Sequence, residues 1–417
     1  MWIILRLLIG ISVLILVEFY FIRRISQSLL CLFPDFVNTK FKIIKRIFLV
    51  WANLYPVILI FVFVYASITG VFITQPQNIF YDYLLVYPFW ILFLLMIQTS
   101  LYFAVVDLIT LVFYPVYKRN KENILSIKSK LVIGITVFFL VYAPIRIIYD
   151  YNSVSIRIIE YKKADFPAVL ENFKIAFISD IQADRYTNEA RLINYMNNVN
   201  SVNPDLILIA GDIITTGPDH IKTGAKTLGM LKSKYGTYTC IGDHDNWAYR
   251  DDYSKSIKEI TSALKENKIE MFDNTKKTIN VGSAQIEVTF ITNTYVESVN
   301  EELLDSISSA PAGDLNIFLT HQPKPDLIES AHKNNYDLFL TGHTHGGQIT
   351  FLFPFVHLSP TMFETEYIRG DFWFDNLSSS GDKASMLMVV TRGLGMSLAP
   401  IRYNSTPEVT LIVLKNK

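Results

Sequence analysis

The sequence is poor in the residues that build stapled, fibrous or low-complexity chains. It contains 2 cysteines, 16 prolines and 18 glycines in 417 residues. These counts exclude a disulfide-stabilised scaffold, a collagen-like chain and a disordered polypeptide. Cys31 lies in a basic segment and Cys240 in an apolar one, so we expect no structural disulfide between them. The cysteines therefore carry little information about the redox compartment.

The chain also lacks a net charge, because 38 Lys and Arg residues balance 38 Asp and Glu residues. This balance hides a division along the chain. Residues 1–150 contain 13 basic and 6 acidic side chains, a net charge of +7, and the remaining 267 residues carry −7. All seven histidines lie in the second part. Length and charge together predict two parts, 1–150 and 170–417, joined by a linker at 151–169 that enters an edge strand.

The first part contains four apolar stretches long enough to cross a lipid bilayer, which takes about 20 residues. They lie at 1–22, 47–73, 84–114 and 131–149. None of them alternates with a polar face, so the sequence predicts four transmembrane helices. Their ionisable groups lie within a few turns of an end, and we expect these side chains to reach the membrane interface. These groups are Arg6, Glu18, Asp107 and Arg146.

The connecting segments predict the orientation in the membrane. Several Lys and Arg residues follow the first and third apolar stretches, whereas residues 74–83 contain none. Basic loops stay in the cytoplasm, and an even number of spans returns the chain to its starting side. We therefore expect a multi-pass protein of the inner membrane whose second part is extracytoplasmic. Because Arg23 and Arg24 follow the first stretch, it has the features of an uncleaved anchor and not of a signal peptide.

The second part consists of short apolar runs that end in polar residues. Five runs of four to six residues are apolar on both faces, which is typical of strands covered by helices. In open α/β sheets the site forms at the carboxyl ends of the strands, so we expect the residues after these runs to converge. Mixed carboxylate and imidazole side chains suit divalent first-row metals. The residues in question are Asp180, Gln182, Asp212, Asp243, His244, Asp245, His321, His343 and His345.

The order and spacing of these residues resemble the calcineurin-like metallophosphoesterases, in particular their bacterial membrane-associated branch. The family motifs are Asp-x-His, Gly-Asp, Gly-Asn-His-Asp/Glu, a lone His and Gly-His-x-His. The most specific counterpart is the segment 342–348, Gly-His-Thr-His-Gly-Gly-Gln. The resemblance covers about residues 170–417, and it implies an α/β domain in which two β-sheets are sandwiched by helices.

The resemblance also implies a site with two divalent metal ions that hydrolyses phosphoric esters. One metal would be held by Asp180, Gln182, Asp212 and His345. The other would be held by Asp212, Asp243, His321 and His343, with Asp212 bridging. A metal-activated water would attack phosphorus. His244 would face the phosphate, with Asp245 orienting its ring.

Two residues depart from the family motifs. Gln182 stands where His is usual, and Asp243 stands where Asn is usual. An amide oxygen is a weaker ligand than imidazole and favours a harder metal, so we expect Mn²⁺ before Zn²⁺ or Fe²⁺. Two interpretations remain open: an active phosphomonoesterase or phosphodiesterase, and a catalytically degenerate membrane sensor or scaffold that binds a phosphorylated ligand.

The segment Phe351–Val356 bears on the substrate. It is either a run packed in the core or an apolar lip that contacts the bilayer or holds an acyl chain, and His357 after it is expected to be packed. An extracytoplasmic domain on a membrane anchor predicts lipid-linked or envelope phosphoesters as substrates. Nucleic acid is not expected, because the second part is net negative and has no basic stripe. The sequence leaves the oligomeric state open.

Overall fold

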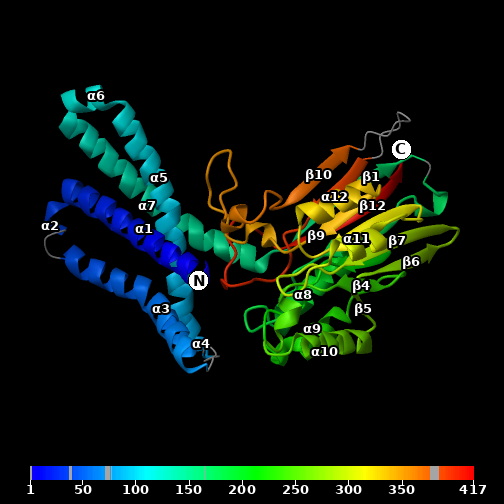
Figure 1. The fold of residues 1–417 in the computed structure, drawn as a ribbon. Coiled ribbons are helices and arrows are strands. Elements are labelled where there is room, and N and C mark those ends of the chain that lie inside the picture. Colours follow the sequence, from blue (N-terminus) through cyan, green and yellow to red (C-terminus); the bar gives the residue numbers. More distant parts are fainter. Residues whose placement is uncertain (1, 37–39, 71–75, 77, 165, 376–384) are drawn as a thin grey trace. The chain divides into compact units, whose positions relative to one another are not determined.

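The computed structural model describes residues 2–36, 40–70, 76, 78–164, 166–375 and 385–417 (Figure 1). It contains two compact units, Met1–Ile148 and Tyr149–Lys417. Among the described residues the first unit is helical and the second contains all the strands. Each unit is described separately below.

Long helices make up the first unit, in keeping with the apolar runs of the sequence. Within the described residues, three helices are long and apolar enough to cross a membrane, at Lys42–Thr69, Ile79–Val112 and Lys121–Asn152. The remaining predicted span falls in the 31-residue helix α1. Residue 1 and residues 71–73 of the predicted spans lie outside the described residues. The helical elements are α1 (Trp2–Leu32), α2 (Pro34–Phe36), α3 (Lys42–Thr69), α4 (Ile79–Tyr81), the π-helical turn η2 (Asp82–Val86), α5 (Tyr87–Val112), α6 (Tyr114–Arg119) and α7 (Lys121–Asn152).

Two of the ionisable groups in these helices are paired inside the unit. Asp107 of α5 contacts Lys128 of α7 at 2.6 Å and also pairs with Arg24 of α1. Glu18 accepts a hydrogen bond from Asn53 at 2.8 Å. The expectation that such side chains reach the interface does not include these partners within the unit. A carboxylate among apolar helices is costly unless it is paired, and here it joins neighbouring helices.

The second unit is a sandwich of two six-stranded sheets. In the first sheet β2, β3, β4 and β5 are parallel, and β12 runs antiparallel to β2 and parallel to the edge strand β1. Its order is β1 (Ser155–Lys163), β12 (Glu408–Asn416), β2 (Lys174–Ile178), β3 (Leu206–Ile209), β4 (Thr237–Cys240) and β5 (Glu270–Phe272). Residues 151–169, predicted to be a linker, thus include the end of α7 and the whole of β1.

The second sheet has parallel inner strands between two antiparallel edges. Its order is β10 (Gly370–Asp375), β11 (Ser385–Val390), β9 (Leu338–Thr341), β8 (Leu315–Thr320), β7 (Ala284–Ile291) and β6 (Thr275–Val281). The five apolar runs of the sequence are β2, β3, β4, β8 and β9. Four of these five strands are buried along their whole length, which explains why they do not alternate with polar residues.

Helices cover the outer faces of both sheets, so the predicted architecture of two sheets sandwiched by helices is confirmed (Figure 1). Side chains of both sheets form one core between them. The helices on the first sheet are α8 (Glu189–Ser201), α9 (Ile221–Leu228) and α10 (Tyr253–Glu266), and those on the second are α11 (Glu301–Ser308) and α12 (Pro325–Lys333). Short 3₁₀ turns are η3 (Ala168–Leu170), η4 (Pro218–His220), η5 (His244–Trp247), η6 (His345–Gly347) and η7 (Pro360–Phe363).

Candidate metal centre

The loops after five parallel strands bring metal-ligating side chains from both sheets together. Asp180, Asp212 and His321 offer ligand atoms that all lie within 4.8 Å of one another, and so do Asp243, His321 and His343. These residues follow β2, β3 and β4 of the first sheet and β8 and β9 of the second. The centre therefore lies where the carboxyl ends of the inner strands of the two sheets meet.

His321 is the residue common to both groups, and it is fully buried. Its Nδ1 lies 2.6 Å from the carbonyl oxygen of Ala210 and so carries the hydrogen that this oxygen accepts. Its Nε2 faces the carboxylates of Asp212 and Asp243, at 3.3 Å from an oxygen of each. Burial lowers the pKa of this imidazole, but the two carboxylates outweigh it and hold the pKa well above its usual value. A divalent cation could be bound by this nitrogen and the two carboxylates together.

The other end of the cluster is formed by Asp180, Gln182 and His345. His345 Nε2 lies 3.4 Å from Asp180 Oδ1. The Gln182 amide donates to Asp212 Oδ2 at 2.7 Å. Burial and the neighbouring Arg402 guanidinium hold the pKa of His345 well below its usual value, so this imidazole stays neutral. A neutral imidazole is the form that ligates a metal.

The turns that carry these residues have unusual backbone conformations. Positive φ angles, between 49° and 69°, occur at five of the seven candidate ligands, which are Asp180, Gln182, Asp212, His343 and His345. A left-handed conformation outside glycine costs free energy and persists only where the surroundings enforce it. Such strain in five ligand positions is typical of a site whose geometry is fixed before a ligand arrives.

Three buried atoms of the cluster make no hydrogen bond within the part of the chain that the structure describes. They are Asp180 Oδ1, Gln182 Oε1 and His321 Nε2. Buried polar atoms without a partner are rare and need an explanation. A carboxylate oxygen, an amide oxygen and an imidazole nitrogen are all metal donors, so the residues present fit a centre for divalent cations.

Asp243 is held by residues that lie outside the sequence motifs. Gln322 Nε2 lies 2.8 Å from both carboxylate oxygens, and the backbone N–H of Tyr295 donates to Oδ1 at 2.7 Å. Burial raises the pKa of Asp243, but His321 and His343 hold it well below its usual value, so the group is ionised. Position 243, where the family motif has the amide Asn, thus carries a charged carboxylate, and the side chain of Gln322 supplies an amide next to it.

His244 lies at the half-buried side of the cluster. Its Nδ1 is 2.6 Å from the carbonyl oxygen of Thr215, and its Nε2 is 3.1 Å from the hydroxyl of Ser397. A carbonyl can only accept, so Nδ1 carries a hydrogen. Nε2 is therefore the ring atom that can exchange a proton with a substrate.

Asp245 does not orient the His244 ring, contrary to the expectation from the sequence. Its buried carboxylate accepts hydrogen bonds from the backbone N–H groups of Gly242 at 2.8 Å, Asp212 at 3.0 Å and Ile213 at 2.8 Å. The ring is held by a main-chain carbonyl instead. Asp245 ties the loop after β3 to the loop after β4, and it thereby fixes the backbone of Asp212.

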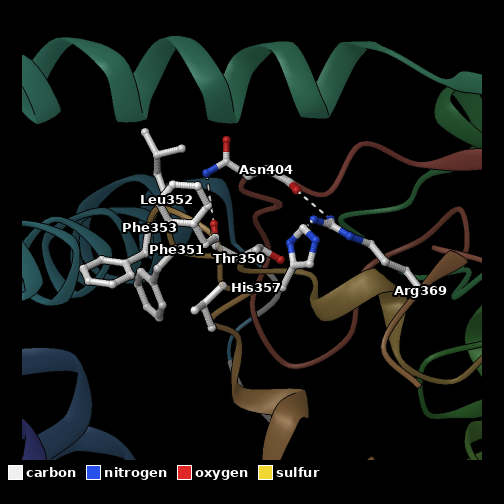
Figure 2. A pocket seen from close by; sticks show the side chains of 9 residues that line it. Thr350, Phe351, Leu352, Phe353, His357, Arg369 and Asn404 are labelled. Carbon is white, nitrogen blue, oxygen red and sulfur yellow. Dashed lines mark hydrogen bonds between the residues drawn. The ribbon is translucent and has the colours of Figure 1, made fainter. Parts of the chain in front are cut away.

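An apolar pocket of about 340 Å³ lies beside the turn that carries His345. Figure 2 shows apolar side chains of 351–353 at one side of it and His357 and Arg369 at the other. Arg369 Nη2 lies 3.0 Å from His357 Nδ1, and its Nη1 donates to the carbonyl oxygen of Gly346 at 3.4 Å. His357 is exposed, so the expectation that it is packed is wrong. Of the segment Phe351–Val356 only Phe351 is buried, which favours the apolar lip over the core run.

Comparison with known proteins shows what the second unit is similar to. The family model for calcineurin-like phosphoesterases matches residues 173–347, the range that holds all the candidate ligands. A metallophosphoesterase of Campylobacter jejuni is 28% identical over 323 residues, which cover 75% of this chain and 76% of that protein. Because the second unit is 269 of the 417 residues, this alignment continues into the first unit.

Two further relatives resemble the chain at similar levels. A transmembrane protein with a metallophosphoesterase domain from Danio rerio is 26% identical over 298 residues, covering 69% of this chain and 63% of that protein. A phosphodiesterase of Escherichia coli is 26% identical over 262 residues, covering 62% of this chain and 88% of that protein. The combination of apolar helices with this domain is thus found in a relative as well.

Proposed function

We propose that this chain, whose residues 173–347 match the calcineurin-like phosphoesterases, is a membrane-anchored enzyme that hydrolyses lipid-linked or envelope phosphoesters outside the cytoplasm. The family gives the activity class, which is metal-dependent hydrolysis of phosphoric esters. The substrate, the side of the membrane and the roles of single residues are our inference. The observation that carries it is a buried cluster of metal donors whose surrounding loops expose large apolar side chains.

We assign two metal positions to the cluster, one to Asp180, Gln182, Asp212 and His345 and one to Asp212, Asp243, His321 and His343. The buried atoms of Asp180, Gln182 and His321 that make no hydrogen bond among the described residues support this assignment. Divalent cations bound there supply Lewis acidity and lower the pKa of a coordinated water. We propose Mn²⁺ as the ion, because Gln182 offers an amide oxygen where the family usually has imidazole.

His244 is the proton donor of the proposed reaction. Its Nδ1–H is held by the Thr215 carbonyl, so a second proton on Nε2 is directed toward the Ser397 side of the cluster. From there it would pass to the leaving oxygen of the ester. Asp245 acts on the backbone and not on this ring, because its carboxylate holds the amide of Asp212 in place.

Three strongly exposed apolar side chains of the second unit support a lipid-linked substrate. Phe355, Phe363 and Leu398 are exposed to 105%, 90% and 94%, more than any other large apolar side chain described in this unit. Leu398 follows Ser397, which contacts His244, and Phe363 precedes Glu364, which contacts His343. Side chains this exposed are unfavourable in water and favourable against acyl chains. The chain also contains helices that are long and apolar enough to cross a membrane, and an enzyme anchored by them would work close to acyl chains.

A comparison of two substrates tests the lipid preference. Full-length chain in lipid nanodiscs with Mn²⁺ is given a soluble aryl phosphodiester or a phosphodiester that carries acyl chains. Replacing Phe355 or Leu398 by Ser should lower kcat/KM for the acylated ester about tenfold, because about 1.5 kcal/mol of apolar contact is lost. Hydrolysis of the soluble ester should not change. Leu303→Ser on α11, 40% exposed, is the matched control and should alter neither.

Other outcomes would contradict parts of the proposal. Equal rates for the two esters, unaffected by the substitutions, would contradict a lipid-linked substrate. Tight binding of phosphoesters without turnover in the metal-loaded chain would favour the sensor or scaffold. The orientation has a separate test: a reporter fused after Lys417 should be active only outside the cytoplasm, and a cytoplasmic signal would overturn it.

A further inference from the structure

His343 lies between two carboxylates that contact opposite nitrogens of its ring. Nδ1 is 2.8 Å from Asp243 Oδ2, and Nε2 is 2.9 Å from Glu364 Oε1. Asp243 belongs to the buried cluster, whereas Glu364 follows the turn η7 outside every family motif. The ring therefore connects the cluster to a residue that the sequence motifs do not include.

Tyr295 joins the same two carboxylates from a third segment. Its backbone N–H donates to Asp243 Oδ1 at 2.7 Å, and its phenol hydroxyl donates to Glu364 Oε1. Its ring packs edge-on against the His343 ring, with the centroids 5.5 Å apart and the planes at 67°. Tyr295 thus holds both carboxylates that contact the His343 imidazole, and its own ring packs against the imidazole.

The chemistry of an imidazole ligand gives this arrangement a consequence. A neutral imidazole that binds a cation through Nδ1 must carry its hydrogen on Nε2. That hydrogen then needs an acceptor, and a carboxylate acceptor both fixes the tautomer and makes the ligating nitrogen more basic. Glu364 Oε1 lies at hydrogen-bond distance from this atom. Oε1 of Glu364 thus contacts both His343 and Tyr295, although the side chain is 37% exposed.

We propose that Glu364 is a positioning residue of the metal centre: it holds the His343 imidazole with Nδ1 toward the cation, and Tyr295 holds Glu364. This inference rests on the proposed role of His343 as a ligand. Glu364 does not touch the substrate or the cation in this account. It acts only on the metal position formed by Asp212, Asp243, His321 and His343, and the other position does not depend on it.

Metal affinity tests the proposal without relying on turnover. Mn²⁺ binding to full-length chain is measured by electron paramagnetic resonance, and the absorption of the Co²⁺-loaded chain is recorded. Glu364→Ala should weaken one of two binding steps about 10- to 100-fold, the range typical of outer-shell partners of metal-bound histidine, and should alter the Co²⁺ bands. Glu364→Gln keeps an acceptor oxygen without the charge and should lie between Ala and wild type. Tyr295→Phe should show a smaller loss in the same step.

Glu366→Ala is the matched control, since Glu366 is an exposed carboxylate two residues further on. It should bind both metals as the wild type does. If Glu364→Ala also binds both with unchanged affinity and Co²⁺ spectrum, the positioning role is wrong while the proposed function stands. If the wild type binds no divalent metal at all, the proposed function and this inference both fail. A loss in both binding steps would contradict a role confined to His343.

Discussion

The two units treat apolar side chains in opposite ways. In the first unit large apolar groups such as Phe61 and Ile68 are exposed to 76% and 78%, and the carboxylate of Asp107 is paired inside. In the second unit the apolar groups form cores, and carboxylates and imidazoles are gathered in one buried cluster. Large apolar side chains are commonly exposed on a surface that faces lipid, whereas on a surface that faces water they are more often buried. The most exposed large apolar side chains described in the second unit, Phe355, Phe363 and Leu398, therefore carry information about its partner.

Removal of the Asp212 charge should have the largest effect, because Asp212 belongs to the buried cluster of metal donors, and no such cluster occurs among the described residues of the first unit. We expect Asp212→Asn to lower turnover at least about 100-fold, or about 2.7 kcal/mol, since one ligand of both proposed metal positions is weakened. Steady-state hydrolysis of an aryl phosphodiester measures it. Asp219→Asn, an exposed carboxylate on η4, should have no effect. Undiminished turnover in Asp212→Asn would show that the cluster is not the active site.

Buried and exposed phenylalanines should respond differently to truncation. Phe318 of β8 is fully buried and stacks on Phe339 with centroids 5.1 Å apart. We expect Phe318→Ala to lower the free energy of unfolding of the second unit by about 3–5 kcal/mol. Phe61→Ala should leave it unchanged, because Phe61 belongs to the other unit. Urea unfolding in detergent, followed by near-ultraviolet circular dichroism, compares the two, and equal losses would contradict separate units.

The two cysteines should differ in reactivity, because one is exposed in the first unit and the other is buried in the second. Cys31 is exposed, whereas Cys240 at the end of β4 is buried, and burial raises the pKa of its thiol to about 12. Only the thiolate is alkylated, and a raised pKa keeps the neutral form up to higher pH. At pH 8.5 the thiolate fraction of Cys240 is roughly 1000-fold below that of an ordinary cysteine.

Mass spectrometry after iodoacetamide treatment checks this expectation. Cys31 should be modified in the folded chain, and Cys240 only after unfolding in urea. The folded protein should become less stable as pH rises above the ordinary thiol pKa, since only the unfolded chain ionises there. Rapid modification of Cys240 in the native state would mean that the end of β4, next to the metal centre, opens to solvent.

Much of the fold could be predicted because its signals are local. The runs before Asp180, Asp212 and His343 are short and apolar on both faces, and each is a buried strand in the structure. The spans were visible for the same reason, since about 20 apolar residues in a row need no partner to be recognised. The convergence of strand ends follows from parallel topology alone.

The contacts between loops could not be predicted, because they depend on residues far apart in the sequence. Gln322 was adjacent to a candidate ligand, and its position after His321 was the one available signal. Tyr295 and Glu364 lie in loops without a motif, and they meet at His343 only through the fold. The resemblance implies that Asp245 orients the His244 ring, whereas its carboxylate accepts hydrogen bonds from three backbone amides.

The pairing of charged groups in the helical unit cannot be predicted from the sequence for a related reason. Asp107 lies within a few turns of a helix end, so sequence position alone predicts that it reaches the interface. Its partners Arg24 and Lys128 belong to two other helices, and their approach depends on helix packing. A hydropathy profile has no information about such contacts.

The most direct test of the central claim is to count the metal in purified full-length chain and follow hydrolysis as it is removed and returned. The account predicts about two divalent ions per chain, loss of phosphodiester hydrolysis when a chelator removes them, and recovery on addition of Mn²⁺. Hydrolysis that persists in metal-free chain would contradict it. So would a chain that binds no divalent metal under any of these conditions.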